Sequence, residues 1–69
     1  MKVSDIIKLR CSIYNEFKHW FSFNRKYKCL YCDWSPNDDE LNQLLHFVEP
    51  FGFNVLFVFP CSVFIYAKK

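Results

Sequence analysis

The chain has 69 residues, of which 52% are hydrophobic and 22% aromatic, with one Gly and three Pro. This composition excludes a disordered chain and predicts one small domain, residues 1–69, built around an aromatic core. The formal net charge is only +2 but is unevenly spread: residues 1–28 carry seven basic and two acidic side chains, and residues 29–69 carry two basic and five acidic ones.

Four cysteines in so short a chain are compatible with the disulfide framework of a secreted protein. The N-terminus is amphipathic and lacks an apolar core followed by a small-residue cleavage site, so we expect no signal peptide. Free thiols and a cytoplasmic location are therefore expected. The most apolar segment, residues 51–67, is too short for a membrane-spanning helix and is interrupted by Pro60, so no membrane association is expected.

The first elements along the chain have two interpretations. In residues 1–7 the alternation of apolar side chains fits a short edge strand. A stripe of helical spacing from Ile6 to Trp20 fits instead a helix that begins at Ser4 and runs through this segment. Over residues 12–23 the apolar positions share one face at the helical period, so a helix is expected there under both interpretations.

A second helix is predicted after residue 35. Ser35 has the character of an N-cap, and Pro36 suits the first helical position. The acidic residues 38–40 lie where the positive end of the helix dipole favours them. We expect this helix to end at Pro50 and Gly52.

Short aromatic-rich and β-branched segments bounded by turn residues predict strands at residues 27–34, 53–59 and 63–67. With a strand at residues 1–7 the order is βαβαββ, without an internal repeat. A strand–helix–strand unit implies a right-handed parallel crossover, and the closing hairpin adds an antiparallel strand. The sequence therefore predicts an α/β (α+β) two-layer sandwich, with two helices on one face of a mixed four-stranded sheet.

Cys11 is the most informative candidate for chemistry, because the helix expected at residues 12–23 begins beside it. Free N–H groups and the positive end of a helix dipole favour thiolate over thiol, and Lys8 and Arg10 act in the same direction. Thiolate is the form that attacks, carries sulfur or binds metal. The alternative is a partly buried cysteine that serves as a small apolar side chain.

With this order of elements the chain resembles the SirA/TusA-like family of small sulfur carriers over nearly its whole length. Asp5, Leu9, Arg10 and Cys11 stand at the places of the family's aspartate and its Gly-Leu-x-Cys motif. The segment from Cys29 to Pro36 is similar to the family's strand and Pro-led second helix. The chain departs from the motif at Lys8, which replaces the glycine, and it lacks both prolines that follow the cysteine.

The resemblance implies a small cytoplasmic carrier that accepts a persulfide on Cys11 from a cysteine desulfurase and passes it to a sulfur-acceptor protein. Asp5 and Arg10 would support the Cys11 loop, no cofactor is implied, and no independent turnover is expected, although an enzyme remains open. The alternative is a non-catalytic protein-interaction module of the same fold that has lost carrier chemistry.

A zinc-binding module is the third candidate. Cys29 and Cys32 form a C-x-x-C pair, and His46 follows Cys32 at nearly the spacing of a zinc finger. A second histidine is missing, and in an extended strand the two cysteines point to opposite faces. No metal is therefore expected.

Two further features bear on partners. The basic cluster Arg25, Lys26 and Lys28 fits RNA or an acidic protein, but also a solvated loop, and nucleic acid is not expected as a partner. Six aromatic side chains compete for space in a small core: Tyr14, Trp20, Phe21, Phe23, Phe51 and Phe53. An exposed remainder would mark a protein partner or a homodimer face, unless the core hides them all.

Overall fold

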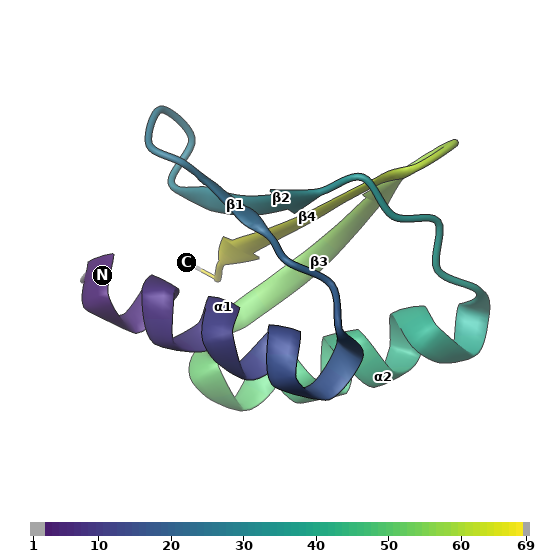
Figure 1. Ribbon diagram of the computed structural model, residues 1–69, viewed down its shortest axis with the longest axis horizontal. Coiled ribbons are helices and arrows are strands. Elements are labelled where there is room, and N and C mark those ends of the chain that lie inside the picture. The colour runs from purple at the N-terminus through teal and green to yellow at the C-terminus, as the bar shows by residue number, and fades with distance from the viewer. Residues whose placement is uncertain (1–2, 69) are drawn as a thin grey trace.

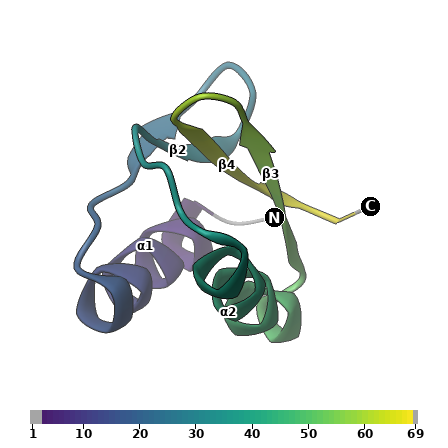
Figure 2. The same ribbon diagram turned by 90° about the vertical axis from the view of Figure 1, so that its right-hand side faces the viewer.

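A computed structural model describes residues 3–68 and shows two helices beneath a twisted sheet (Figure 1). The elements in chain order are α1 (Val3–Phe17), β1 (Ser22–Asn24), β2 (Cys29–Cys32), α2 (Asp38–Val48), the 3₁₀ turn η1 (Glu49–Phe51), β3 (Phe53–Val58) and β4 (Ser62–Ala67). Both helices lie on one face of the four-stranded sheet (Figure 2). The expected α+β class, two layers and one-sided helices are confirmed.

Of the two interpretations of the first segment, an edge strand or the start of a helix, the structure has the helix. Residues 3–7 form the first turns of α1, and residues 1 and 2 lie outside the described residues. Ile6, Leu9 and Ile13 recur at helical spacing and are all buried against the sheet. This apolar stripe stabilises the helix from its first turn onward, so the expected edge strand at residues 3–7 is wrong.

The sequence pattern does not predict β1, and this strand changes the topology. The helix expected to reach residue 23 ends at Phe17, and Lys18 adopts a left-handed conformation with a φ of 62°. Ser22–Asn24 then pairs antiparallel with β2 across a tight loop, residues 25–28. The order of elements is αββαββ instead of βαβαββ, and the sheet is antiparallel throughout instead of mixed. A three-residue strand is too short for its alternation to be recognised in the sequence.

The second helix begins slightly later than expected, because its cap is Asn37 and not Ser35. The Asn37 side chain accepts a hydrogen bond from the Glu40 N–H at 2.8 Å, and the Glu40 carboxylate accepts one from the Asn37 N–H at 3.1 Å. This reciprocal capping box satisfies two backbone donors. The acidic first turn is confirmed, and the helix continues through η1 to Gly52, whose φ of 85° suits glycine.

The same α–β–β unit occurs twice, although the sequence predicts no repeat. The second strand of each unit, β2 or β4, lies at the centre of the sheet, and these two strands pair antiparallel. Leu30 and Ile65 face each other at the middle of this pairing, and both are fully buried.

The core fills the space between the sheet and the helices. Its buried members are Ile6, Leu9, Ile13, Phe21, Leu30, Trp34, Leu44, Val48, Phe53, Val63 and Ile65. Side chains alternate between the two faces of a strand, so every second residue of each strand points away from this core. The helices cover one face of the sheet, and the other face is left uncovered by the described residues (Figure 2).

We expect Asn37→Ala to lower the free energy of unfolding by about 1 kcal/mol, because it removes the side-chain half of the capping box. Ser35→Ala is the matched control and should change stability by less than about 0.5 kcal/mol, since Ser35 is exposed and precedes the cap. Urea denaturation of the two variants measures both values. A larger loss in Ser35→Ala than in Asn37→Ala would contradict the observed start of α2.

Candidate functional site

Cys11 does not lie at the start of a helix. Residues 3–10 of α1 precede it, and its side chain is exposed on the third turn. The free N–H groups and the positive end of the dipole act within the first turn, so they do not reach this thiol. The expected position of Cys11 is therefore corrected: the apolar stripe that begins at Ile6 starts the helix well before it.

The two residues expected to support Cys11 have other surroundings. Asp5 lies in the first turn of α1, where it interacts favourably with the helix dipole. The guanidinium carbon of Arg10 lies 4.5 Å from the centre of the Trp20 ring, a cation–π arrangement. Cys11 lies within a regular helix, so there is no loop for these side chains to hold.

The candidate zinc ligands Cys29, Cys32 and His46 lie at separate places in the fold. The strand registers place Cys29 opposite Tyr66 on the uncovered face, and Cys32 on the inner face against the core. His46 lies on α2 with Nδ1 3.8 Å from the Glu49 carboxylate. Within residues 3–68, no group of three or more His, Cys, Asp or Glu side chains could hold a metal ion. Cys29, Cys32 and His46 are thus not brought together.

The four cysteine thiols are all free but differ in environment. Burial raises the pKa of the Cys29 thiol. Burial also raises the pKa of Cys32, and the negative charge of Asp33 adds to this effect. Cys11 and Cys61 are exposed. The two cysteines of β2 are therefore protonated, poorly reactive side chains at neutral pH.

The uncovered face of the sheet forms the most distinctive surface of the described residues. Its outward-pointing side chains, which we call the open sheet face, follow from the strand registers: Ser22, Asn24, Cys29, Tyr31, Asn54, Leu56, Val58, Ser62, Phe64 and Tyr66. Half of these ten are large apolar or aromatic residues. Such a surface on the uncovered side of a sheet is typical of an interaction site.

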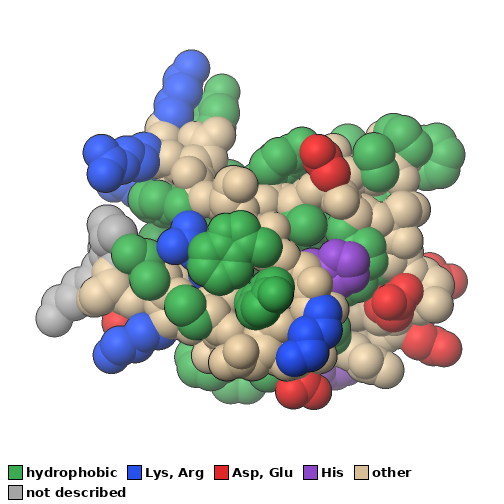
Figure 3. All heavy atoms as spheres, in the orientation of Figure 1, with side chains coloured by type: hydrophobic (Ala, Val, Ile, Leu, Met, Phe, Trp, Pro, Cys, Tyr) green, Lys and Arg blue, Asp and Glu red, His purple; other side chains and the backbone are tan. Residues whose placement is uncertain are grey.

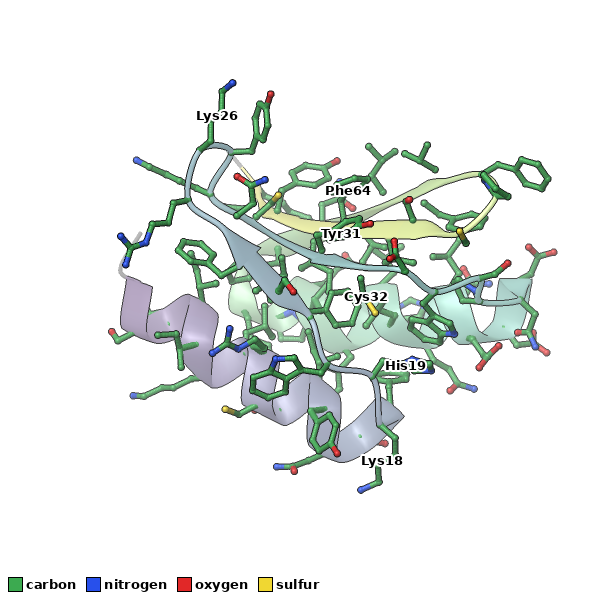
Figure 4. All side chains as sticks on the ribbon, turned by 45° about the horizontal axis from the view of Figure 1, so that its top comes forward. Lys18, His19, Lys26, Tyr31, Cys32 and Phe64 are labelled. Carbon is green, nitrogen blue, oxygen red and sulfur yellow. The ribbon has the colours of Figure 1, made fainter. Side chains whose placement is uncertain are left out.

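Three aromatic rings occupy the two central strands of the open sheet face. Tyr31 on β2 lies directly opposite Phe64 on β4, with ring centroids 5.3 Å apart, and the two lie side by side in Figure 4. Tyr66 follows two residues after Phe64 on the same face and accepts a hydrogen bond from Asn54 Nδ2 at 3.2 Å. The three rings therefore lie on the same face of the two central strands, and Tyr31 and Phe64 pack against each other.

A hydrogen bond fixes the orientation of one of these rings. The Tyr31 hydroxyl donates to the Asp33 carboxylate. This bond is the main reason that the pKa of the Tyr31 phenol is raised, with smaller contributions from desolvation and from the charge of Asp33. The Asp33 carboxylate therefore lies beside the Tyr31 hydroxyl, at one end of the open sheet face.

Two hairpin loops border the open sheet face. Both rise on the side away from the helices and at opposite ends of the sheet (Figures 1 and 2). The β3–β4 turn carries Phe59, whose side chain is 84% exposed, beside the exposed Leu56 and Val58 on β3. The β1–β2 loop carries the basic cluster. The aromatic rings of the open sheet face thus lie between the apolar β3–β4 turn and the basic β1–β2 loop.

The charge asymmetry of the sequence becomes a spatial separation in the fold. Arg25, Lys26 and Lys28 are exposed in the β1–β2 loop, with Lys26 at its outer end (Figure 4). Basic side chains gather over this loop at the upper left of Figure 3, and most of the acidic ones visible in this view lie at the right. The acidic side chains of α2 belong to the helix layer. The positive charge therefore borders the open sheet face.

The six competing aromatic side chains divide between core and surface. Phe21 and Phe53 are buried, and Phe23 packs at the edge of the core. Tyr14, Trp20 and Phe51 are exposed. Some of the six aromatic side chains are therefore exposed, as expected. The rings of the open sheet face are other residues, which the sequence analysis did not single out because it did not assign faces to β2 and β4.

Comparison with known proteins supplies no relative. No protein-family model matches the chain, and the curated proteins and the solved structures searched with it contain no match. The resemblance to sulfur carriers therefore rests on the motif residues alone. As for membranes, none of the helices within residues 3–68 has the length and apolar character needed to cross a bilayer.

Alkylation of the native protein with iodoacetamide should modify Cys11 and Cys61 first and Cys29 and Cys32 more slowly. Burial limits access to the two β2 thiols and raises their pKa values, so little thiolate is present at neutral pH. Peptide mass spectrometry over time measures the four rates, and labelling in denaturant, where the rates should converge, is the control. Equal native rates for Cys11 and Cys29 would contradict the observed burial.

Proposed function

We propose that this protein is a non-catalytic binding module whose open sheet face binds single-stranded nucleic acid. The observation that carries the proposal is the set of three aromatic rings on the central strands of an uncovered antiparallel sheet, bordered by a basic loop. Aromatic side chains stack on bases of any sequence, and Lys and Arg attract the phosphates. Four-stranded sheets with exposed aromatic residues bind single-stranded RNA in this way.

The strand registers supply a path across the face. Phe64 and Tyr31 lie opposite each other, and Ser22 lies opposite Tyr31 on β1. Neighbouring strands are about 4.8 Å apart, so a chain that crosses them perpendicularly meets successive side chains of this row. A nucleic acid that stacks on Phe64 and Tyr31 therefore reaches the first residue of β1, and the basic loop at residues 25–28 lies to one side of this path, after Asn24 at the other end of the strand.

The charges of the loop that borders this face fit a polyanionic partner such as nucleic acid. The β1–β2 loop carries three cations and no acidic side chain. The acid nearest the rings along the chain, Asp33, is hydrogen-bonded to Tyr31. This proposal replaces the expectation that nucleic acid is not a partner, which was drawn from a cluster whose place beside the aromatic rings was unknown. A protein partner and a homodimer stay predictions.

Sulfur transfer through Cys11 also stays a prediction, supported by the exposure of its thiol but not by its place in α1. Incubation with cysteine and a cysteine desulfurase tests it directly. A persulfide adduct that persists in Cys61→Ser and disappears in Cys11→Ser would support a carrier that exchanges sulfur with a desulfurase and an acceptor protein. Cys61 is the matched control because it is the other exposed cysteine.

Catalysis has no comparable support. Two hollows on the surface of the described residues, of about 630 and 370 Å³, lie beside α1, the first against α2 and the second against η1. The first contains His46 without a cysteine, serine or threonine, and the second contains Ser12 without a histidine. Neither hollow combines a nucleophile with a histidine base, so we propose no reaction.

We expect Tyr31→Ala and Phe64→Ala each to weaken binding of oligouridine by about 5- to 150-fold, the effect of removing one base-stacking ring. Fluorescence anisotropy with a labelled oligonucleotide at low salt measures the affinity. Phe51→Ala is the control, since this exposed ring lies on η1 away from the open sheet face and its removal should leave binding unchanged. No binding by the native protein, or an equal loss in Phe51→Ala, would refute the proposal.

Binding should also weaken with salt, with a slope of log K against log salt of about −2 if the three loop cations each contact a phosphate. Replacing Arg25 and Lys26 by Ser and Lys28 by Asn should flatten this slope; Asn is chosen because Lys28 has a φ of 52°. Lys8→Ser on α1 is the control and should leave the slope unchanged. A slope that the triple variant retains would show that the loop does not contact phosphates.

A further inference from the structure

We infer that Trp20 provides an additional base-stacking position at the β1 edge, outside the open sheet face, so that a longer single strand binds more tightly than a short one. This inference rests on the proposed function. Trp20 lies in the connection between α1 and β1, and its side chain is 52% exposed, whereas the other tryptophan, Trp34, is 9% exposed and belongs to the core.

The Trp20 ring is held in place although half of it is exposed. Tyr14 contacts it edge to face, with ring centroids 5.6 Å apart and an interplanar angle of 79°. The Arg10 guanidinium lies over the ring, with Cζ 4.5 Å from its centre. Both partners come from α1, whose helical backbone fixes their positions. A ring held this way loses little freedom when a base stacks on it, which favours binding.

The side chain that covers Trp20 has an unused hydrogen-bond donor. Arg10 Nε is buried and has no hydrogen-bond partner among the described residues. This buried donor does not face solvent, but the guanidinium carries a positive charge, which attracts the phosphate of a nucleotide stacked on Trp20. Arg10 and Trp20 together therefore present the two groups that recognise a nucleotide, a cation for its phosphate and a ring for its base.

The place of Trp20 in the chain connects it with the proposed path. The row that contains Phe64 and Tyr31 ends at Ser22 on the outer strand β1. Trp20 is two residues before Ser22, at the edge of the sheet where a crossing strand would leave it. The sequence up to residue 28 has a formal charge of +5, so this edge lies in the basic half of the chain. A strand that leaves the sheet here meets Trp20 next.

Intrinsic fluorescence tests the inference, because the chain has only two tryptophans and one of them is buried. The native protein is titrated with oligouridines of about four and about ten nucleotides, lengths within the range of single-strand sites. The longer oligomer should quench the Trp20 emission, and the short one should bind without quenching it. Trp20→Phe identifies the emission that belongs to Trp20.

Affinity provides the second measurement. Trp20→Leu keeps apolar bulk beside Tyr14 but removes the stacking ring, and it should weaken binding of the longer oligomer by about tenfold and leave that of the short one unchanged. Arg10→Gln should weaken binding of the longer oligomer in the same selective way. Thermal unfolding of each variant shows that the fold is retained.

The outcomes separate the two proposals. Tight binding of both lengths by anisotropy, with no change in Trp20 emission and no effect of Trp20→Leu, would overturn the inference and leave the proposed function intact. Absence of binding at either length would overturn both. A blue shift of Trp20 emission with protein concentration alone, together with dimer in sedimentation, would assign this ring to a second copy of the chain and would also overturn the inference.

Discussion

The antiparallel pairing of β2 with β4 is the interaction on which the rest of the structure depends. It joins the two α–β–β units at the centre of the sheet, and it places Leu30 against Ile65 with no solvent access to either side chain. Burial of two such side chains against the helices contributes several kcal/mol, of the order of 1.5–3 each. Because successive side chains of a strand point to opposite faces, the same register brings Tyr31 opposite Phe64 on the other face of the sheet. One pairing thus sets both the core and the candidate binding surface.

The fold also organises the charges of a nearly neutral molecule. Four of the acidic side chains lie in the helix layer at the two ends of α2: Asp38, Asp39 and Glu40 in its first turn, where they interact favourably with the helix dipole, and Glu49 directly after it. The cations of residues 25–28 lie in a loop on the opposite side, beside the open sheet face (Figure 3). The net charge of the chain is only +2, but three cations lie close together in this loop, so the local electrostatic potential there is more positive than the net charge suggests. The local arrangement of charges, and not the net charge, determines the electrostatic potential at this surface.

Several features of the fold follow from local patterns and could be predicted. The hairpin at residues 53–67 follows from two apolar runs of strand-forming residues around a turn, and α2 follows from its acidic first turn and its apolar spacing. The cap of α2 was misplaced because Ser35 and Asn37 are both good N-cap residues, and only the backbone of Asn37 meets Glu40. β1 was missed because Phe21 and Phe23 fit a helical stripe as well as a strand. The position of Cys11 was wrong for a separate reason, because the apolar pattern of residues 1–7 fits a strand as well as a helix and the expected helix start depended on that choice.

The sequence by itself determined the amount of apolar surface, the identity of most elements, and the presence of a basic cluster, because these depend on residues close together in the chain. Only the tertiary structure decided which cysteines are buried, which rings share a face, and what lies beside the cluster. Those properties depend on strand pairing between residues more than thirty positions apart, such as Tyr31 with Phe64. Periodicity assigns a residue to one of two faces of its own strand, but it does not say which strand lies next to it or which face the helices cover.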